Sequence, residues 1–311
     1  MQSSISQQSF PAQNTLLSLL ESVETLMLAS IGVTSPQISR TKDAASEAAA
    51  YHLQAGGQRA RTKIALQAAL DIGLPPDDGI VIAATVELLH NASLVHDDIE
   101  DGDEYRRGQP AVWRKFGVNT AICTGDLLLS AAYATLCRLS NTQVLPLMLS
   151  LVHQRVSMAI DGQCADLSAG SITLVDSAAA LRRYEQIATA KSGALLGLPL
   201  ELALMAAGCQ DYLSDAWEAA QAFAIGYQIV DDLQDLQADL CHASDHRYNI
   251  AAVFSASGSL AEAMEKSRQH GLEKIELTIT QARRLPYNTG ERLADIARTL
   301  RYTLSECKFK D

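Results

Sequence analysis

Two aspartate clusters of the same spacing hold the residues of this chain that are best suited to chemistry. They read Asp97-Asp98-Ile99-Glu100-Asp101 and Asp231-Asp232-Leu233-Gln234-Asp235. In each cluster the first and last carboxylates are four residues apart, so on a helix they share a face, with the middle one beside them. Each follows an apolar run, where carboxylates are costly unless a cation neutralises them. The pattern predicts a Mg²⁺ site, because Mg²⁺ combines a few carboxylate oxygens with water and phosphate oxygens.

A single Asp-Asp-x-x-Asp is more often a solvated helix end than a metal site. Here the motif occurs twice, about 130 residues apart, each time behind an apolar run and near basic residues. The repetition favours the functional interpretation.

The basic residues are informative by position. Gly56-Gly57 precedes Arg59 and Arg61, so backbone N–H groups and two arginines could gather at one helix start, which suits a phosphate; a flexible turn is the alternative. Arg106-Arg107 lies just beyond the first cluster. Lys191 stands in an otherwise apolar helix, where it could equally extend to the surface.

Composition and periodicity favour a helical protein. Of 311 residues, 48% are hydrophobic and 20% charged, which is too apolar for a disordered chain. Apolar positions recur at helical spacing almost throughout, which predicts an all-α protein of ten or more helices. No long Gly/Ser-rich or Pro-rich linker follows residue 15, so we expect a flexible N-terminal tail over residues 1–14 and one catalytic domain over residues 15–311.

Several classes of protein fit the sequence poorly. A formal net charge of −11 argues against a nucleic-acid-binding surface. The N-terminal residues lack the features of a signal peptide, and no uninterrupted apolar run is long enough for a transmembrane segment. Six cysteines without Cys-x-x-Cys spacing favour reduced thiols in a cytoplasmic protein.

A series of motifs over about residues 45–250 resembles the trans-isoprenyl diphosphate synthases (polyprenyl synthetases), and in particular the geranylgeranyl diphosphate synthases. The motifs are Gly57-Gln58-Arg59-Ala60-Arg61, His90 to Asp98, Arg106 to Pro110, Gly125-Asp126, Gly162-Gln163 with Asp166, Lys191-Ser192, and Gly226 to Asp232. The resemblance implies a single helical bundle around a central apolar cavity (the type I isoprenoid synthase fold), usually a homodimer. It also implies condensation of an allylic diphosphate with isopentenyl diphosphate to give a trans-prenyl diphosphate.

The resemblance assigns roles to individual residues. The six aspartates would hold about three Mg²⁺ ions that bridge to the allylic diphosphate: Asp97, Asp98, Asp101, Asp231, Asp232 and Asp235. Arg106 and Lys191 would contact the same diphosphate, with Ser192 beside the lysine. The acceptor diphosphate would lie against Arg61, His90, Arg107 and Gln58. Gln228, one turn before Asp232, would orient that carboxylate or its metal, or would be a capped core amide.

The sequence departs from the family pattern on the cationic side of the site. The family usually has Lys at the position of Gln58, and the loss of that charge could weaken binding of the acceptor by about 1 kcal/mol or more. Residues 236–248 also lack the lysines that the family carries there, although His246 or Arg247 could replace one of them.

Three functions therefore remain open. The first is chain elongation with isopentenyl diphosphate. The second is a diverged enzyme, terpene synthase-like or a prenyltransferase with another acceptor, that ionises an allylic diphosphate. The third is a non-catalytic partner subunit, which the complete aspartate clusters argue against because unused buried carboxylates would destabilise the fold.

Product length can be argued from the helix that carries the first cluster. Ala92 and Ser93 lie one turn before Asp97 on the same face, and both are small. We expect them to line the substrate cavity without closing it, which favours a product of C20 (geranylgeranyl) or longer.

Overall fold

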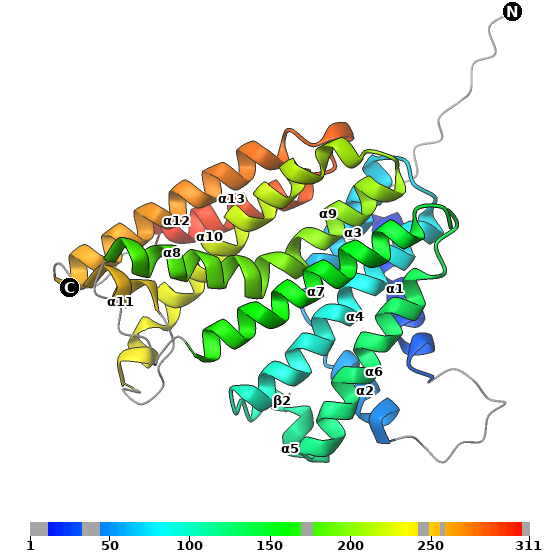
Figure 1. Cartoon of the computed structure of the whole chain (residues 1–311), viewed down its shortest axis with the longest axis horizontal. Coiled ribbons are helices and arrows are strands. Elements are labelled where there is room, and N and C mark those ends of the chain that lie inside the picture. The colour runs from blue at the N-terminus through cyan, green and yellow to red at the C-terminus, as the bar shows by residue number, and fades with distance from the viewer. Residues whose placement is uncertain (1–11, 33–43, 169–176, 242–248, 256–258, 307–311) are drawn as a thin grey trace, which may run out of the picture. The chain divides into compact units, whose positions relative to one another are not determined.

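The computed structural model describes residues 12–32, 44–168, 177–241, 249–255 and 259–306 (Figure 1). These residues form more than ten α-helices, which confirms the all-α prediction. They also contain one minimal hairpin, which the sequence analysis did not anticipate. The chain groups into two compact units, unit 1 (residues 1–70 and 75–142) and unit 2 (residues 71–74 and 143–311).

Unit 1 is built around one long helix, α4. Its elements are α1 (Ala12–Ser30), α2 (Ala44–Gln54), α3 (Ala60–Asp71), α4 (Pro76–Glu100), β1 (Tyr105–Arg106), β2 (Gln109–Pro110), α5 (Val112–Phe116) and α6 (Val118–Leu136). Proline in the first turn of α4, followed by two aspartates, suits a helix start. The middle of α4 is almost fully buried against α1 and α6, and its far end carries the first aspartate cluster (Figure 1).

The hairpin follows the first aspartate cluster directly. Strands β1 and β2 pair antiparallel, with Arg106 opposite Gln109. Arg107 and Gly108 form the two-residue turn, and both have positive φ, 53° and 78°. A type I′ turn requires this conformation at both positions. The turn brings the chain back immediately after β1, which fixes Arg106 beside the end of α4.

Unit 2 is organised around α10. Its elements are α7 (Leu145–Leu167), α8 (Ser177–Ala188), a π-helical turn η2 (Thr189–Gly193), α9 (Ala194–Ala206), η3 (Gln210–Tyr212), α10 (Leu213–Cys241), α11 (Ile250–Ser255), α12 (Leu260–Ala282), η4 (Pro286–Asn288) and α13 (Glu291–Glu306). Helices α10 and α12 run side by side (Figure 1). A Cβ on Gly226 would lie 2.8 Å from Cγ1 of Ile275, so glycine allows the two helices to approach closely. This helix pair supports the second aspartate cluster.

The helix boundaries refine the expectation for the N-terminal tail. Helix α1 begins at Ala12, three residues before the expected boundary at residue 15, and residues 1–11 lie outside the described part of the chain. The single catalytic domain over residues 15–311 stays a prediction beside the two compact units.

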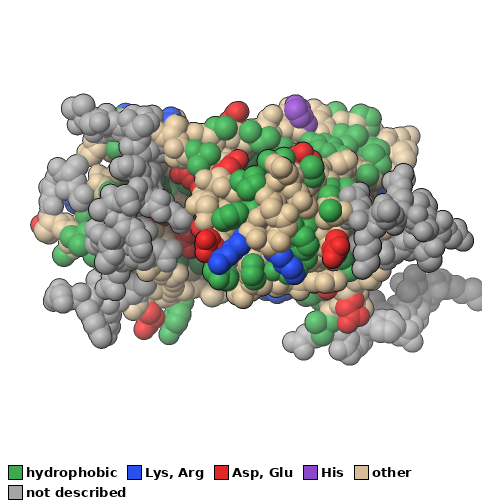
Figure 2. Space-filling view, turned by 90° about the horizontal axis from the view of Figure 1, so that it is seen from below, with side chains coloured by type: hydrophobic (Ala, Val, Ile, Leu, Met, Phe, Trp, Pro, Cys, Tyr) green, Lys and Arg blue, Asp and Glu red, His purple; other side chains and the backbone are tan. Residues whose placement is uncertain are grey.

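Two helical stretches are long and apolar enough to cross a bilayer by length and composition alone, Pro76–Glu100 and Ser177–Ala206. Within the apolar windows of these stretches, 72% and 78% of the residues are buried in the protein. Such burial is typical of core helices in a bundle. On the face shown in Figure 2, acidic, basic and apolar side chains are interspersed.

Helices α8 and α12 are joined by a charge cluster that makes stability pH-dependent. Glu185 accepts from His270 Nε2 at 2.9 Å and pairs with Lys274 Nζ at 2.6 Å. The hydrogen bond from His270 and the charge of Lys274 lower the pKa of Glu185 to about 2 from 4.5, against the opposing effect of burial. Because the folded-state pKa is the lower one, this contribution is complete above pH 4.5 and is lost as the pH falls toward 2.

We therefore expect Glu185→Gln to lower the free energy of unfolding by about 1–2 kcal/mol at pH 6, after allowance for the solvent exposure of the cluster. The difference between wild type and variant should shrink by about half at pH 3.5. Denaturant unfolding of both proteins at the two pH values measures it. A difference that stays constant with pH would show that the contribution of Glu185 is not electrostatic.

Candidate functional site

The first aspartate cluster lies at the C-terminal end of α4. Asp97 is half-buried, Asp98 is buried, and Asp101, which caps the helix, is exposed. The backbone N–H of Asp101 donates to the carbonyl of Asp97 at 2.8 Å, so the helical geometry continues to the last residue of the motif. The two accessible carboxylates, Asp97 and Asp101, therefore share one face of the helix, as the spacing indicated.

Asp98 is buried and holds Arg106. Arg106 Nε donates to Asp98 Oδ1 at 2.6 Å, and its Nη2 contacts the same oxygen. Arg106 also donates to Asp103 at 3.2 Å. Burial raises the pKa of Asp98, while the hydrogen bond and charge of Arg106 oppose that rise. Arg106 remains 26% exposed, so the aspartates fix its position and leave part of the guanidinium open to an anion.

A cationic group of side chains surrounds two neutral histidines in unit 1. Burial lowers the pKa of His52 to about 3, and the charges of Arg107 and Arg106 act in the same direction. Burial lowers the pKa of His90 well below its usual value, with Arg61 and Arg107 adding to the effect. Both imidazoles are thus neutral at physiological pH. The positive charge here belongs to the arginines, while the histidines can only donate or accept neutral hydrogen bonds.

The turn before α3 packs directly on Arg107. A Cβ on Gly57 would lie 2.9 Å from Cζ of Arg107, and the φ of 138° at this position favours glycine. Arg107 itself donates to Asn91 Oδ1 at the long distance of 3.5 Å. The structure thus brings together the Gly-Gly turn and Arg107, which the sequence showed only as separate motifs.

Arg59 has a different role from the one suggested by its place at the helix start. Its Nη1 donates to Glu87 at 2.9 Å, and the hydroxyl of Thr62 donates to the same carboxylate at 2.7 Å. Burial alone would raise the pKa of Glu87, but the hydrogen bond from Thr62 and the charge of Arg59 outweigh it and the pKa lies below its usual value. Arg59 therefore joins α3 to α4 within unit 1.

Gln58 is exposed, and an ammonium group lies against its backbone. Lys63 Nζ donates to the carbonyl of Gln58 at 2.9 Å. The lysine comes from the second turn of α3, five residues further along the chain. A positive charge is therefore present at residue 58 even though the side chain there is an amide.

The second aspartate cluster lies on α10, where Asp232 is enclosed by hydrogen bonds. Gln228 Nε2 donates to Asp232 Oδ1 at 2.8 Å. The hydroxyl of Tyr184 and the backbone N–H of Ile250 both donate to Asp232 Oδ2 at 2.9 Å. Burial raises the pKa of Asp232 to about 6, although these three donors act in the opposite direction. The carboxylate is thereby fixed to α8 and to the start of α11.

The other members of the second cluster differ from Asp232 in accessibility. Asp231 is exposed. Asp235 lies in the same helix four residues later, but its side chain is outside the described part of the chain, as are His246 and Arg247. Gln228 donates directly to Asp232, which is the contact that its orienting alternative requires, and that role stays a prediction.

Lys191 lies in the π-helical turn η2. Single π-turns inside α-helices are rare and frequent at functional sites. A Cβ on Gly162 would lie 2.3 Å from the backbone nitrogen of Lys191, so glycine lets α7 contact this turn. Lys191 Nζ donates to Asp166 Oδ2 at 2.7 Å and is 27% exposed. Ser192 follows in the same turn and is half-buried.

The remaining motif residues lie on α4 and α6. A Cβ on Gly125 would lie 2.1 Å from Nε2 of His96, so glycine allows α6 to approach α4 next to the first cluster. Ala92 is buried, whereas Ser93 is exposed and donates to the carbonyl of His90 at 2.8 Å. Of the two small residues expected to line a cavity, Ser93 is therefore the one with free space around it.

The sequence analysis missed several residues that position the site. They are His52, Glu87, Asn91, Asp103 and Tyr184. The sequence could have indicated Glu87 and Asn91, because they are polar, four residues apart and within an apolar helical run. Polar residues in such a run must find hydrogen-bond partners when they are buried. Tyr184 and His52 act through contacts that depend on the fold, so their spacing in the sequence carried no signal, whereas Asp103 lies only three residues before Arg106.

The donor set suits Mg²⁺ that binds together with a phosphate ligand. In the described part of the chain no three His, Cys, Asp or Glu side chains lie close enough together to hold a metal by themselves. Each cluster instead offers accessible carboxylate oxygens on one helix face, and Asp98 Oδ2 is a buried oxygen without a hydrogen-bond partner among the residues that the structure describes. Since Mg²⁺ is usually bound by one or two carboxylates together with phosphate oxygens, the residues fit metal that arrives with a phosphate ligand.

Comparison with known proteins identifies the family. The model of the family described as polyprenyl synthetase matches residues 42–273. The chain belongs to the polyprenyl synthetase family. It is 34% identical over 200 residues to a geranylgeranyl diphosphate synthase of Methanosarcina mazei, covering 62% of this chain and 59% of that protein. It is 30% identical over 238 residues to a farnesyl diphosphate synthase of Geobacillus stearothermophilus, covering 72% and 78%.

The fold of the family extends over nearly the whole chain. The structure of a geranylgeranyl pyrophosphate synthetase from Pyrococcus horikoshii matches with a TM-score of 0.77 at 22% identity, covering 94% of this chain and 99% of that one. This likeness confirms the fold expected from the motifs. By sequence, the chain aligns with only 60% and 59% of the lengths of the first curated relatives that it matches.

Proposed function

We propose that this protein is a Mg²⁺-dependent trans-prenyltransferase that condenses an allylic diphosphate with isopentenyl diphosphate. The observation that carries the proposal is the shared design of the two aspartate clusters. In each, the middle aspartate is buried and held by protein donors, while the first is left accessible on the helix surface. Fixed carboxylates beside open ones are suited to a bound cation that must accept further ligands.

The reaction begins with loss of diphosphate from the allylic substrate, which leaves a carbocation and a leaving group of high negative charge. Asp97, Asp101 and Asp231 would hold magnesium ions, which would supply charge neutralisation of that group. Arg106, fixed by Asp98, and Lys191, fixed by Asp166, are oriented cations whose exposed parts stabilise the same developing charge. In this proposal Asp235 is a metal ligand together with Asp97, Asp101 and Asp231. Asp232 holds the second cluster in position.

The acceptor diphosphate lies, in this proposal, against the cationic group of unit 1. Arg61 and Arg107 supply charge, and His90, which is neutral, donates a hydrogen bond. The Gly57 turn brings backbone close to Arg107. Proton removal from the condensed cation falls to the released diphosphate, as the resemblance suggests.

An assay with and without the acceptor tests the proposal. The protein is incubated with Mg²⁺ and dimethylallyl, geranyl or farnesyl diphosphate, with and without isopentenyl diphosphate, and products are identified by mass. Longer diphosphates that form only with isopentenyl diphosphate support elongation. Hydrocarbons or alcohols formed without it would instead assign the protein to the second candidate function, ionisation without elongation. No reaction in either arm, with activity restored by a second synthase subunit, would assign it to the non-catalytic class.

The second candidate is favoured by one observation, the amide at residue 58. We expect Gln58→Lys to lower the KM for isopentenyl diphosphate about threefold to tenfold, because a charged donor replaces a neutral one at the acceptor. Steady-state kinetics with the acceptor varied measures this. The matched variant Lys63→Met should raise the same KM, since its ammonium lies at the backbone of residue 58. The acceptor does not bind beside residue 58 if both variants keep the wild-type KM for isopentenyl diphosphate and the wild-type KM for the allylic substrate.

Product length is proposed as C20 or longer, and Ser93 gives the test. Since its side chain is exposed, Ser93→Phe places a ring in free space without overpacking the core. We expect the main product to shorten by at least one isoprene unit, as measured by mass. Ala92→Phe is the less direct variant, because Ala92 is 3% exposed and a ring there would strain the packing. Unchanged product length in Ser93→Phe would contradict the proposed lining.

We further propose that the protein acts as a homodimer, as the resemblance implies, and that it works in the cytoplasm, as its cysteine usage suggests. Val118 and Ile122, four residues apart on α6, are 44% and 45% exposed and offer an apolar strip for a second copy. Light scattering coupled to size exclusion distinguishes dimer from monomer, and Ile122→Glu should shift the equilibrium toward the monomer.

A further inference from the structure

Asn249 joins the start of α11 to the second aspartate cluster. It comes directly before α11, a helix that packs against α8, α10 and α12. The residue is 7% exposed, although asparagine is mostly found at protein surfaces. A buried amide has two donor hydrogens and an acceptor oxygen, and these groups need hydrogen-bond partners. The partners of Asn249 therefore indicate what it does in the fold.

The two ends of this amide have different partners. Asn249 Oδ1 accepts from the backbone N–H of Ala251 at 2.8 Å, which is the contact of a residue that caps a helix start. Asn249 Nδ2 donates to the backbone carbonyl of Asp232 at 3.0 Å. These contacts fix the orientation of the amide, because the reversed amide would set two donors together at one end and two acceptors together at the other. One side chain thus caps α11 and holds α10 at the cluster.

Asp232 is held through both its backbone and its side chain. Its carboxylate accepts from three donors, one of which is the backbone N–H of Ile250 at 2.9 Å. Ile250 follows Asn249 directly, so the start of α11 contacts the carboxylate and the carbonyl of the same aspartate. Asp231, which is exposed, precedes Asp232 in the same helix. A shift of the backbone that Asn249 holds would therefore move Asp231 as well.

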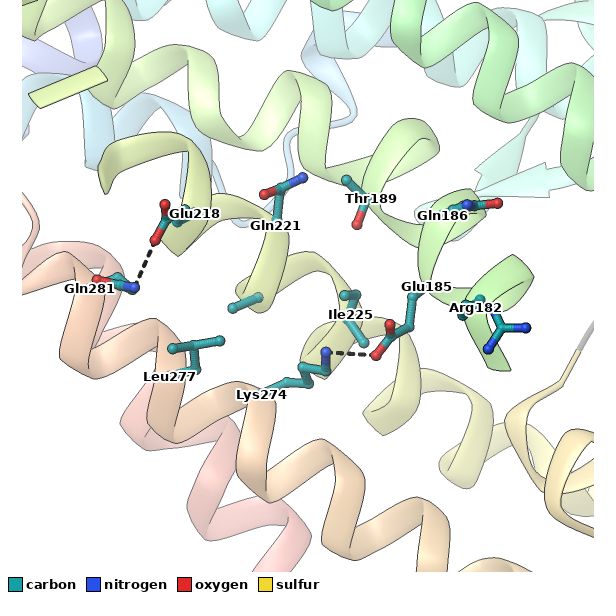
Figure 3. Close-up of a pocket in the computed structure, with 11 residues that line it drawn as sticks. Arg182, Glu185, Gln186, Thr189, Glu218, Gln221, Ile225, Lys274, Leu277 and Gln281 are labelled. Atoms are coloured by element: carbon teal, nitrogen blue, oxygen red, sulfur yellow. Dashed lines mark hydrogen bonds and ion pairs between the residues drawn. The ribbon is translucent and has the colours of Figure 1, made fainter. Parts of the chain in front are cut away.

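Other contacts hold the surrounding helices together without Asn249. A cavity of about 370 Å³ lies among α8, η2, α10 and α12 (Figure 3). Figure 3 shows the ion pair between Glu185 of α8 and Lys274 of α12, at 2.6 Å, among the residues that line it. Asn249 and Asp232 do not belong to that lining. Loss of the Asn249 amide should therefore release the cluster from α11 without separating α8 from α12.

We propose that Asn249 is a positioning residue whose amide sets the affinity of the second aspartate cluster for diphosphate bound with Mg²⁺. The inference rests on the proposed function, in which Asp231 and Asp235 are metal ligands. Asn249 acts through Asp232 and does not itself touch the diphosphate. Metal ligands must be held in place by residues behind them, and the loss of such a residue typically changes metal affinity by about tenfold to a hundredfold.

Calorimetric titration of the full-length protein with inorganic pyrophosphate and Mg²⁺ tests the proposal in two variants, Asn249→Ser and Asn249→Asp. Both keep an oxygen that can cap α11, and both remove the Nδ2 donor. We expect each variant to weaken binding by about tenfold or more. The added negative charge of Asn249→Asp would by itself attract a cation, so weaker binding by this variant cannot be a direct effect of its charge.

Ser259→Ala is the control, because it removes the side chain that caps α12. It should lower the unfolding temperature, as the loss of a helix cap does, and leave pyrophosphate binding unchanged. In steady-state kinetics the Asn249 variants should raise the KM for the allylic diphosphate. They should leave the KM for isopentenyl diphosphate unchanged, because the acceptor is assigned to unit 1.

The outcomes distinguish this inference from the proposed function. Wild-type affinity for pyrophosphate in both Asn249 variants would overturn the inference and leave the proposed function standing. Equal losses of affinity in Ser259→Ala and in the Asn249 variants would also overturn it, because the effect would then follow stability and not position. Failure of the wild type to bind pyrophosphate with Mg²⁺ would overturn the proposed function, and this inference with it.

Discussion

Asp97→Asn is expected to lower kcat of the condensation about a hundredfold to a thousandfold. Asp97 is one of the two accessible carboxylates at the end of α4, and its amide analogue has the same shape without the negative charge that holds a divalent cation. The loss should fall mainly on kcat, because the charge that the metal neutralises develops in the transition state. Steady-state kinetics with saturating Mg²⁺ measures it.

Asp77→Asn is the matched control for this variant. Asp77 is another aspartate of α4, but it is exposed and lies in the first turn, at the opposite end of the helix. It should keep wild-type kcat and lose only a few tenths of a kcal/mol of stability. If Asp97→Asn retains more than half of the wild-type kcat, the first cluster does not hold a catalytic cation.

Arg155→Met is expected to lower the free energy of unfolding by about 3–5 kcal/mol. Arg155 on α7 donates to Glu201 Oε2 at 2.9 Å through Nε, and its Nη2 contacts the other oxygen. Its guanidinium also stacks on Trp217, 3.8 Å from the ring centroid. Glu201 is 1% exposed, so removal of the arginine leaves a buried carboxylate without its counter-charge.

The unfolding temperature should fall by about 10 °C. Burial already raises the pKa of Glu201, and the loss of Arg155 removes the group that opposes that rise. Arg301→Met is the control, since it breaks an exposed pair with Glu276 and should cost no more than about 1 kcal/mol. The double variant Arg155→Met with Glu201→Leu should recover at least half of the loss, because it removes the buried charge as well. A double variant no more stable than Arg155→Met would show that packing, not charge, dominates.

The sequence predicted those features that depend on local spacing. The four-residue interval within each Asp cluster placed Asp97 and Asp101 on one helix face, and the helical periodicity predicted the all-α fold. Glycines whose Cβ would collide with another helix, such as Gly125 and Gly162, also belonged to recognisable motifs. Local spacing was sufficient here because a helix converts sequence distance directly into position.

Contacts between distant segments could not be predicted. Tyr184 reaches Asp232 across 48 residues, and no periodicity relates the two. The π-helical turn at Lys191 packs closely against Gly162 of α7, and the sequence suggested only an ordinary helix there. In the sequence Arg59 and Arg61 looked equivalent. In the fold Arg59 forms an ion pair with Glu87, which is buried.

The most direct measurement is the Mg²⁺-dependent binding of inorganic pyrophosphate to wild type, Asp97→Asn, Asp231→Asn and the double variant, followed by calorimetry. Because the proposal assigns both clusters to the same diphosphate, each single variant should weaken binding by at least about 2.7 kcal/mol, a hundredfold. The double variant should be scarcely weaker than either single one. Retention of wild-type affinity by either single variant, or tight binding of pyrophosphate without Mg²⁺, would contradict the account.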